Sequence, residues 1–221
     1  QRRIMKFFVI IKKKSERVPN KNFLLLNNKP LYRHLLDEIH SEEVYIDTDS
    51  QRIYNDLKNS DIICYKRKDK FIQLENDRSF GVSPVLQMVE NFLDNYVDDD
   101  NEIIVTPHVT SPFIKLSTII DASKMLTKGY DSVQACTEHQ EFTYFLGKPV
   151  NFNHDVVQKT QDLDPVVMGN GAFFIFTKKT FKKYKNRTGG NPYFYPLRFP
   201  EGIEIDNPED FELAKALSYD K

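Results

Sequence analysis

Short apolar runs of the kind that form buried β-strands alternate with segments of helical period along most of this chain. The runs that predict strands are residues 4–11, 44–46, 62–65, 102–106, 131–136, 172–176 and 203–205. Helix-starting residues stand between them, at Pro30, Ser50, Ser83–Pro84, Thr110–Ser111–Pro112 and Asn207. A strand-helix-strand order with right-handed crossovers produces parallel strands. The sequence therefore predicts an α/β fold in which helices flank both faces of a mainly parallel sheet.

Three intervals interrupt this rhythm. Residues 138–168 contain Gly147, Pro149 and Pro165, which predict hairpins or an insertion that projects from the main sheet. Residues 66–81 are polar and predict a loop, and residues 187–200 are irregular, with a mobile turn expected at 188–191. The length of 221 residues suits one domain, 1–221, that buries about 70–75% of its unfolded surface.

The charge balance and the cysteines exclude several classes of protein. Lys and Arg number 31 and Asp and Glu 32, a net charge of −1, whereas general nucleic-acid binding usually needs a basic footprint. Cys64 and Cys136 lie in apolar runs without the spacing of a disulfide framework or metal site, which predicts a reducing, cytoplasmic location. The run 4–11 contains Lys6 and is too short to span a membrane. We therefore expect no nucleic-acid or membrane partner.

Positive charge is concentrated directly after the first expected strand. Residues 12–21 contain five cations and one carboxylate, a net charge of +4. Like charges at this density repel one another, so the loop favours a multivalent anion. The carboxyl end of a first strand is also where open α/β sheets bind nucleotide phosphates. Because neither common glycine-rich phosphate motif is present, lysines and Arg17, which can grip an anion with two hydrogen bonds, would hold the phosphates. A solvated, lysine-rich turn is the alternative.

Two acidic pairs are candidate metal ligands. Glu204 and Asp206 alternate in an expected strand, so their carboxylates should face one way. Such a pair suits Mg²⁺ bound together with substrate phosphates, and an interaction of Asp206 with the dipole of the following helix is the alternative. Asp47-Thr48-Asp49 ends the second strand. This motif is similar to the metal-binding D-x-D of nucleotide-sugar glycosyltransferases, or it is a polar strand end before a helix cap.

Two further positions suit ligand contacts. Of the five histidines, His108 lies just after the expected strand 102–106, where a ligand is expected. Asn170 can both donate and accept hydrogen bonds, and Gly171 allows a ligand to approach the backbone closely.

Taken in order, these segments resemble the acylneuraminate cytidylyltransferases, the enzymes that make CMP-sialic acid and related CMP-sugars. The resemblance rests on KKKSERVPNKN and FLLLNNKPLYRHLL near the N-terminus, and then on IDTDS, HVTSP, GNGAFFIF and IEIDNPEDFELA. It covers nearly the whole chain, and the ordered set is more specific than any one motif. It implies a Rossmann-like nucleotidyltransferase fold. It also implies a homodimer in which 138–168 is an inserted dimerisation segment that reaches the neighbouring subunit's site.

The resemblance further implies a reaction and its residues. CMP would pass from CTP to a hydroxyl of a sugar acid, sialic acid-like or Kdo-like, with release of pyrophosphate and with Mg²⁺ as cofactor. Lys12, Lys21 and Asp206 would be catalytic, the two lysines holding the triphosphate, and Glu204 would bind the metal together with Asp206. The implied substrate contacts are Ser15 and Asn22 near the triphosphate, Arg67 near the cytosine, and His108 and Asn170 near the sugar.

The chain departs from the family pattern at several positions. Lys12 replaces an arginine, Lys14 a glycine, Glu16 a lysine, Glu204 an aspartate and His108 a glutamine. The positive charge of the loop remains, and His108 points to an unusual acceptor: a nonulosonic acid, a Kdo-like sugar or a non-sugar such as a phosphonate. Two other functions stay open as alternatives. One is a glycosyltransferase in which Asp47 and Asp49 hold Mn²⁺, and the other is a non-catalytic nucleotide- or sugar-binding relative.

Overall fold

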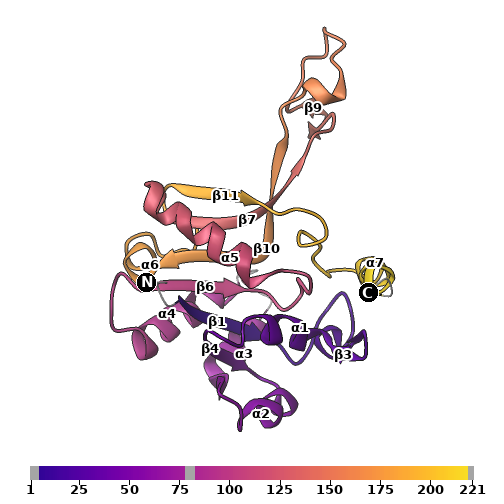
Figure 1. Ribbon diagram of the computed structural model, residues 1–221. Helices are drawn as coiled ribbons and strands as arrows, with labels where there is room; N and C mark the ends of the chain where they lie inside the picture. The colour runs from indigo at the N-terminus through magenta and orange to yellow at the C-terminus, as the bar shows by residue number, and fades with distance from the viewer. Residues whose placement is uncertain (1–4, 78–82, 219–221) are drawn as a thin grey trace.

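Seven strands form one central sheet, in the spatial order β11-β7-β10-β6-β1-β4-β5 (Figure 1). The computed structural model describes residues 5–77 and 83–218. The strands are β1 (Met5–Ile11), β4 (Glu43–Thr48), β5 (Ile63–Lys66), β6 (Ile103–Pro107), β7 (Ser132–His139), β10 (Val166–Thr177) and β11 (Pro192–Pro196). Of these seven, β10 alone runs antiparallel to its neighbours, and the other pairings are parallel. The prediction of a mainly parallel sheet is confirmed.

Helices cover both faces of this sheet, because successive side chains of a strand point to opposite faces. On one face Phe7 and Val9 belong to a cluster with the buried sides of α1, α2 and α5. On the other face Phe8 stacks on Phe92 of α4, with ring centroids 4.4 Å apart, in a cluster that includes α3 and α6. The helices are α1 (Leu31–Glu38), α2 (Gln51–Leu57), α3 (Asp69–Asn76), α4 (Val85–Tyr96), α5 (Leu116–Ser123), α6 (Lys178–Tyr184) and α7 (Pro208–Ser218), with the 3-10 helices η1 (Lys21–Phe23), η3 (Lys124–Lys128) and η4 (Thr160–Asp162).

Three expectations along the chain are wrong. Residues 203–205 form no strand, because the backbone N–H of Ile205 donates to the carbonyl of Thr110, in a loop, at 2.8 Å. Part of the expected loop 66–81 is helix α3, which buries Phe71 against the sheet. The interval 187–200, expected to be irregular, contains the edge strand β11, which pairs with β7. Residue 4 of the expected first strand and residues 78–82 lie outside the described residues.

Side-chain carboxylates stabilise one turn and one helix start in ways that the sequence pattern did not predict. The turn at 188–191 is held by Asp131, which accepts the backbone N–H groups of Gly190 and Asn191 at 2.9 and 3.0 Å. Helix α5 begins at Leu116, several residues after the expected cap at Thr110–Ser111–Pro112. The carboxylate of Glu38 accepts the N–H of Leu116 at 2.9 Å and so satisfies a donor of its first turn.

Strands β7 and β10 continue beyond the sheet as a two-stranded arm (Figure 1). The segment between them contains the short strands β8 (Tyr144–Phe145) and β9 (Lys148–Pro149), paired as a hairpin, and projects away from the other elements. The small antiparallel pair of β2 (Leu25–Leu26) and β3 (Lys29–Pro30) lies before α1. None of the helices within residues 5–77 and 83–218 has the length and apolar character needed to cross a lipid bilayer.

Candidate active site

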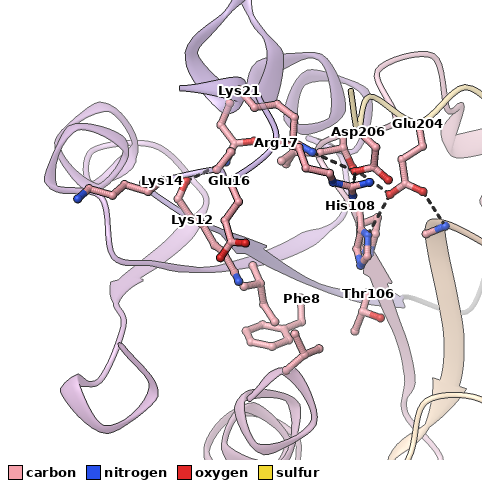
Figure 2. A pocket seen from close by; sticks show the side chains of 18 of the residues that line it. Phe8, Lys12, Lys14, Glu16, Arg17, Lys21, Thr106, His108, Glu204 and Asp206 are labelled. Atoms are coloured by element: carbon pink, nitrogen blue, oxygen red, sulfur yellow. Dashed lines mark hydrogen bonds and ion pairs between the residues drawn. The ribbon is translucent and has the colours of Figure 1, made fainter. Parts of the chain in front are cut away.

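A cavity of about 680 Å³ opens where β1 and β6 end. Three parts of the chain line it: the basic loop after β1, the residues that follow β6, and the segment before α7. The structure thereby brings together eight of the predicted site residues, namely Lys12, Ser15, Arg17, Lys21, Asn22, His108, Glu204 and Asp206. Cationic and anionic groups that are far apart in the sequence therefore share one cavity (Figure 2).

The basic loop is tied directly to the acidic segment. Lys21 lies in η1, and its ammonium donates to the carbonyl of Ile205 at 2.7 Å and to Oδ1 of Asp206 at 3.2 Å. A guanidinium nitrogen of Arg17 lies 2.7 Å from the same carboxylate oxygen (Figure 2). The two cations therefore share one oxygen of Asp206. This contact fixes the loop against the segment before α7.

Asn22 closes the base of the loop. Its side-chain amide donates to the carbonyl of Lys12 at 2.8 Å and so joins residues ten apart in the chain. The side chain is buried, and within the described residues its Oδ1 has no hydrogen-bond partner. The ammonium of Lys12 lies 3.0 Å from Glu75 of α3. The predicted triphosphate lysine is thus ion-paired in this structure, on a side chain that remains half-exposed.

Glu204 is held as an anion by three donors. Oε1 accepts the hydroxyl of Thr110 at 3.1 Å and lies 3.4 Å from Nδ1 of His108, and Oε2 accepts the N–H of Gly171 at 3.0 Å. Burial alone would raise the pKa of Glu204, but these hydrogen bonds outweigh it and lower the pKa below its ordinary value. A Cβ at position 171 would lie 2.5 Å from Glu204 Oε1, so only glycine allows this approach.

The carboxylate pair fits a metal that is also bound by substrate. Among the described residues, no group of three or more His, Cys, Asp or Glu side chains could hold a metal ion. Mg²⁺, however, is commonly bound through one or two carboxylates with waters and substrate phosphates completing its shell. Glu204 and Asp206 line the cavity together with the basic loop. The residues present therefore suit Mg²⁺ delivered with a nucleoside triphosphate.

Asn170 and Arg67 do not belong to the lining of the cavity among the described residues. Asn170 has a positioning contact instead: its amide donates to the carbonyl of Gly202 at 2.9 Å, and its Oδ1 accepts the N–H of Ala172 at 2.7 Å. The neighbouring Gly171 is the residue of this motif that reaches the cavity.

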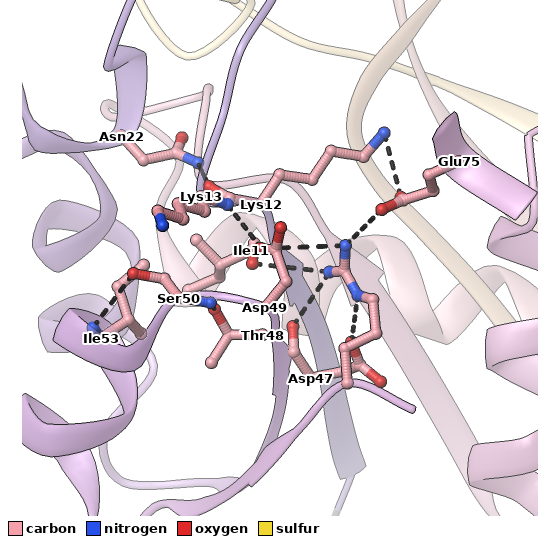
Figure 3. Close-up of polar contacts among 11 residues, drawn as sticks. Ile11, Lys12, Lys13, Asn22, Asp47, Thr48, Asp49, Ser50, Ile53 and Glu75 are labelled. Atoms are coloured by element: carbon pink, nitrogen blue, oxygen red, sulfur yellow. Dashed lines mark hydrogen bonds and ion pairs between the residues drawn. The ribbon is translucent and has the colours of Figure 1, made fainter. Parts of the chain in front are cut away.

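Arg67 instead neutralises the D-x-D motif. The guanidinium is fully buried and lies 2.6 Å from Oδ1 of Asp47 and 2.6 Å from Oε2 of Glu75 (Figure 3). Burial raises the pKa of Asp47 above its ordinary value, although Arg67 acts in the opposite direction. Asp49 accepts the backbone N–H of Lys13 at 2.5 Å. Both carboxylates therefore have internal partners, and the geometry gives the glycosyltransferase alternative no metal site here.

Arg187 is a cavity residue that the sequence did not reveal. It follows α6 and donates to the hydroxyl of Thr106 at 3.3 Å, with its guanidinium carbon 3.9 Å from the ring centroid of Phe174. Burial lowers the pKa of Arg187 to about 10. No local motif surrounds it, because its contacts come from β6 and β10. Only the tertiary fold brings these residues together.

Comparison with known proteins identifies the family. A sequence model described as cytidylyltransferase matches residues 9–220. The chain belongs to the cytidylyltransferase family. Its resemblance to acylneuraminate cytidylyltransferases is confirmed by an N-acylneuraminate cytidylyltransferase of Streptococcus agalactiae serotype III, 27% identical over 211 residues, which are 89% of this chain and 49% of that protein. The cytidylyltransferase chain thus spans about half the length of this relative.

Two further relatives match the cytidylyltransferase chain along nearly their full length. The CMP-N,N'-diacetyllegionaminic acid synthase of Legionella pneumophila is 27% identical over 220 residues, 92% of this chain and 91% of that protein. A solved structure of a CMP:2-keto-3-deoxy-manno-octonic acid synthetase complexed with CTP aligns with a TM-score of 0.67 at 14% identity, covering 98% of this chain and 99% of that one. This structural likeness confirms the Rossmann-like nucleotidyltransferase fold.

Proposed function

We propose that this cytidylyltransferase transfers CMP from CTP to a hydroxyl group of a sugar acid and releases pyrophosphate. The observation that carries the proposal is the meeting of the basic loop with Glu204 and Asp206 around one cavity. A nucleoside triphosphate needs cationic groups for its phosphates, and its counter-cation needs carboxylates nearby. This cavity contains both. The names of the relatives, which denote N-acylneuraminate, legionaminic acid and an octonic acid, support a carboxylic acid as acceptor.

The reaction balances without a covalent enzyme intermediate. The acceptor oxygen forms a bond to the α-phosphorus of CTP in line with the bond to the β-phosphate, which breaks and leaves its electron pair on pyrophosphate. Lys12, Lys21 and Arg17 stabilise the negative charge on the phosphates. The attacking hydroxyl passes its proton to Nε2 of His108, whose Nδ1 on the other side of the ring lies 3.4 Å from the carboxylate of Glu204. Mg²⁺ held by Glu204 and Asp206 would supply Lewis-acid stabilisation of the phosphates.

The proposal extends to assembly and location. We propose a homodimer in which the arm of residues 138–168 reaches the neighbouring subunit, because this arm exposes large apolar side chains such as Phe145 and Leu146.

Cys64 and Cys136 are unpaired, and burial raises the pKa of each thiol to about 11. Unreactive thiols of this kind fit a reducing compartment, and we propose the cytoplasm.

A pyrophosphate-release assay tests the function. CTP with Mg²⁺ and a panel of 2-keto sugar acids should yield pyrophosphate, whereas UTP and GTP should yield little. Lys21→Ala and Asp206→Ala should each lower kcat about 10²–10³-fold, since removing one preorganised group that stabilises the transition state typically costs about 2.7–4 kcal/mol.

The control is Lys185→Ala, which removes an exposed ion pair with Glu90 and should leave turnover unchanged. Normal turnover in both cavity variants would refute the mechanism. Calorimetric binding of CTP without Mg²⁺-dependent turnover on any acid would instead support a non-catalytic relative.

A further inference from the structure

Arg187 is a cation of the cavity for which the described residues provide no anionic partner. Within residues 5–77 and 83–218, its polar contact is the hydroxyl of Thr106 at 3.3 Å, and no carboxylate forms an ion pair with it. The guanidinium lies over the ring of Phe174 at 3.9 Å. Arg17 and Lys21 of the basic loop, by contrast, are both paired with Asp206. The charge of Arg187 is therefore open to an anion that comes from outside the protein.

The surroundings of Arg187 make an external anion favourable. Burial lowers its pKa to about 10, which means that the folded protein keeps the cation with incomplete solvation. A buried charge without a partner is costly, and a bound anion removes much of that cost. Arginine presents five N–H donors in a planar fork, of which one is used by Thr106. The contact with the ring of Phe174 restrains the guanidinium, and the donors that Thr106 does not use can form two parallel hydrogen bonds with a carboxylate.

Arg187 lies apart from the end of the cavity where Lys21 meets Asp206. Thr106, its hydrogen-bond partner, lies with Phe8 at the end of the cavity away from Lys21 and Asp206 (Figure 2). Phe174 contacts both Arg187 and His108: the guanidinium carbon lies 3.9 Å from its ring centroid, and the His108 ring centroid lies 6.2 Å from it. An acceptor whose hydroxyl is near His108 can therefore extend along this wall toward Arg187.

We propose that Arg187 binds the carboxylate of the acceptor and so makes the cavity selective for sugar acids over neutral sugars. The inference rests on the proposed function for the identity of the acceptor. In this arrangement the wall formed by β6 and β10 recognises the acid group, and the basic loop recognises the triphosphate. Arg187 acts in binding and has no part in the proton or phosphoryl transfer.

Calorimetry with a defined probe tests this without turnover. N-acetylneuraminic acid is titrated into the protein with CTP present and divalent cations removed by EDTA, and then its C1 carboxamide is titrated in the same way. The acid should bind Arg187→Ala about 10- to 100-fold more weakly than the wild type, as expected for a lost hydrogen-bonded charge pair. The carboxamide should bind both proteins with the same weak affinity. Arg187→Lys should recover part of the affinity, because it keeps the charge and loses the fork.

A matched control is Arg52→Ala. Arg52 also lies over an aromatic ring, that of Phe23 at 4.7 Å, but does not line the cavity among the described residues. Its variant should bind the acid as the wild type does. In steady-state assays with Mg²⁺, Arg187→Ala should raise the acceptor KM with little change in the KM for CTP.

Two outcomes overturn the inference: equal binding of acid and carboxamide by the wild type, including no binding of either, or equal binding of the acid by wild type and Arg187→Ala. Failure of the proposed function looks different, since the wild type would then release no pyrophosphate from CTP with any acid. The binding result and the turnover result can thus fail separately.

Discussion

Three arginines near the cavity differ in what balances their charge. Arg67 is fully buried between two carboxylates, and Arg17 pairs with Asp206 at the cavity. Arg187 stacks on Phe174 and, among the described residues, has no carboxylate partner. The desolvation of a buried cation is offset by a well-placed anion and otherwise weakens the folded state. Of the three, Arg187 is therefore the one whose desolvation lowers the stability of the ligand-free protein, and a bound anion would offset this loss.

Replacement of Arg187 by methionine should stabilise the ligand-free protein. The folded-state pKa of Arg187 is lowered to about 10, so at pH 7 the folded state keeps a charge that the unfolded chain solvates better. Methionine retains a contact with Phe174 without the charge. Arg187→Met should raise Tm at pH 7, by about 2–4 °C for each kcal/mol gained in a chain of this size. The gain should persist below pH 10 and shrink as pH rises through about 10, where the folded wild type begins to lose the proton.

Differential scanning calorimetry without ligands measures this shift. Arg52→Met is the control, because Arg52 is exposed and should leave Tm nearly unchanged. A lower Tm for Arg187→Met would mean that the hydrogen bond to Thr106 and the stacking on Phe174 outweigh the desolvation of the charge.

At the scale of elements, the sequence predicts those parts of the site that are local. The buried strand β1 and the cations that follow it are adjacent in the chain, so one pattern reveals both. Arg187 depends on contacts with β6 and β10, which no local pattern encodes. The segment with Glu204 and Asp206 was predicted only in part. Its carboxylates reach one cavity as expected, but through an irregular segment anchored by buried Ile205.

This irregular segment makes Asn170 a positioning residue. Its amide holds the carbonyl of Gly202, two residues before Glu204, while its Oδ1 accepts the N–H of Ala172. Without strand partners, the segment depends on such single contacts. Asn170→Ala should therefore displace Glu204 and Asp206 and weaken metal binding more than it weakens the fold.

The test is the Mg²⁺ dependence of pyrophosphate release. Asn170→Ala should need about 10-fold more Mg²⁺ for half-maximal activity, the lower end of the effect of losing a residue that supports metal ligands. The KM for CTP at saturating Mg²⁺ should change little. Asn191→Ala is a matched control, because it also removes an asparagine donor to a glycine carbonyl, but on an exposed turn whose Asn191 does not line the cavity. An unchanged Mg²⁺ requirement in Asn170→Ala would show that the segment holds its place by other contacts.

At the scale of the whole molecule, the arm is a part whose large apolar side chains do not pack against the rest of the domain. Exposed fractions reach 70% for Phe145 and 87% for Leu146, in a hairpin that projects away from the sheet (Figure 1). Apolar side chains gathered on a projecting segment are typical of an interaction surface. In a two-fold symmetric dimer, each arm would pack against the partner subunit. The apolar patches of both arms would then be buried in one interface.

Leu146→Glu tests this packing. A carboxylate in an apolar interface loses its hydration without a partner, so the variant should be a monomer. Size-exclusion chromatography with light scattering should give twice 26.0 kDa for the wild type and 26.0 kDa for the variant. Leu213→Glu on α7, where the leucine is 48% exposed outside the arm, should remain a dimer. If the arm also completes the neighbouring site, Leu146→Glu should lose turnover at enzyme concentrations at which Leu213→Glu keeps it. A monomeric wild type would end the proposal of an arm-mediated dimer, whereas a dimeric Leu146→Glu would place the interface on another face of the domain.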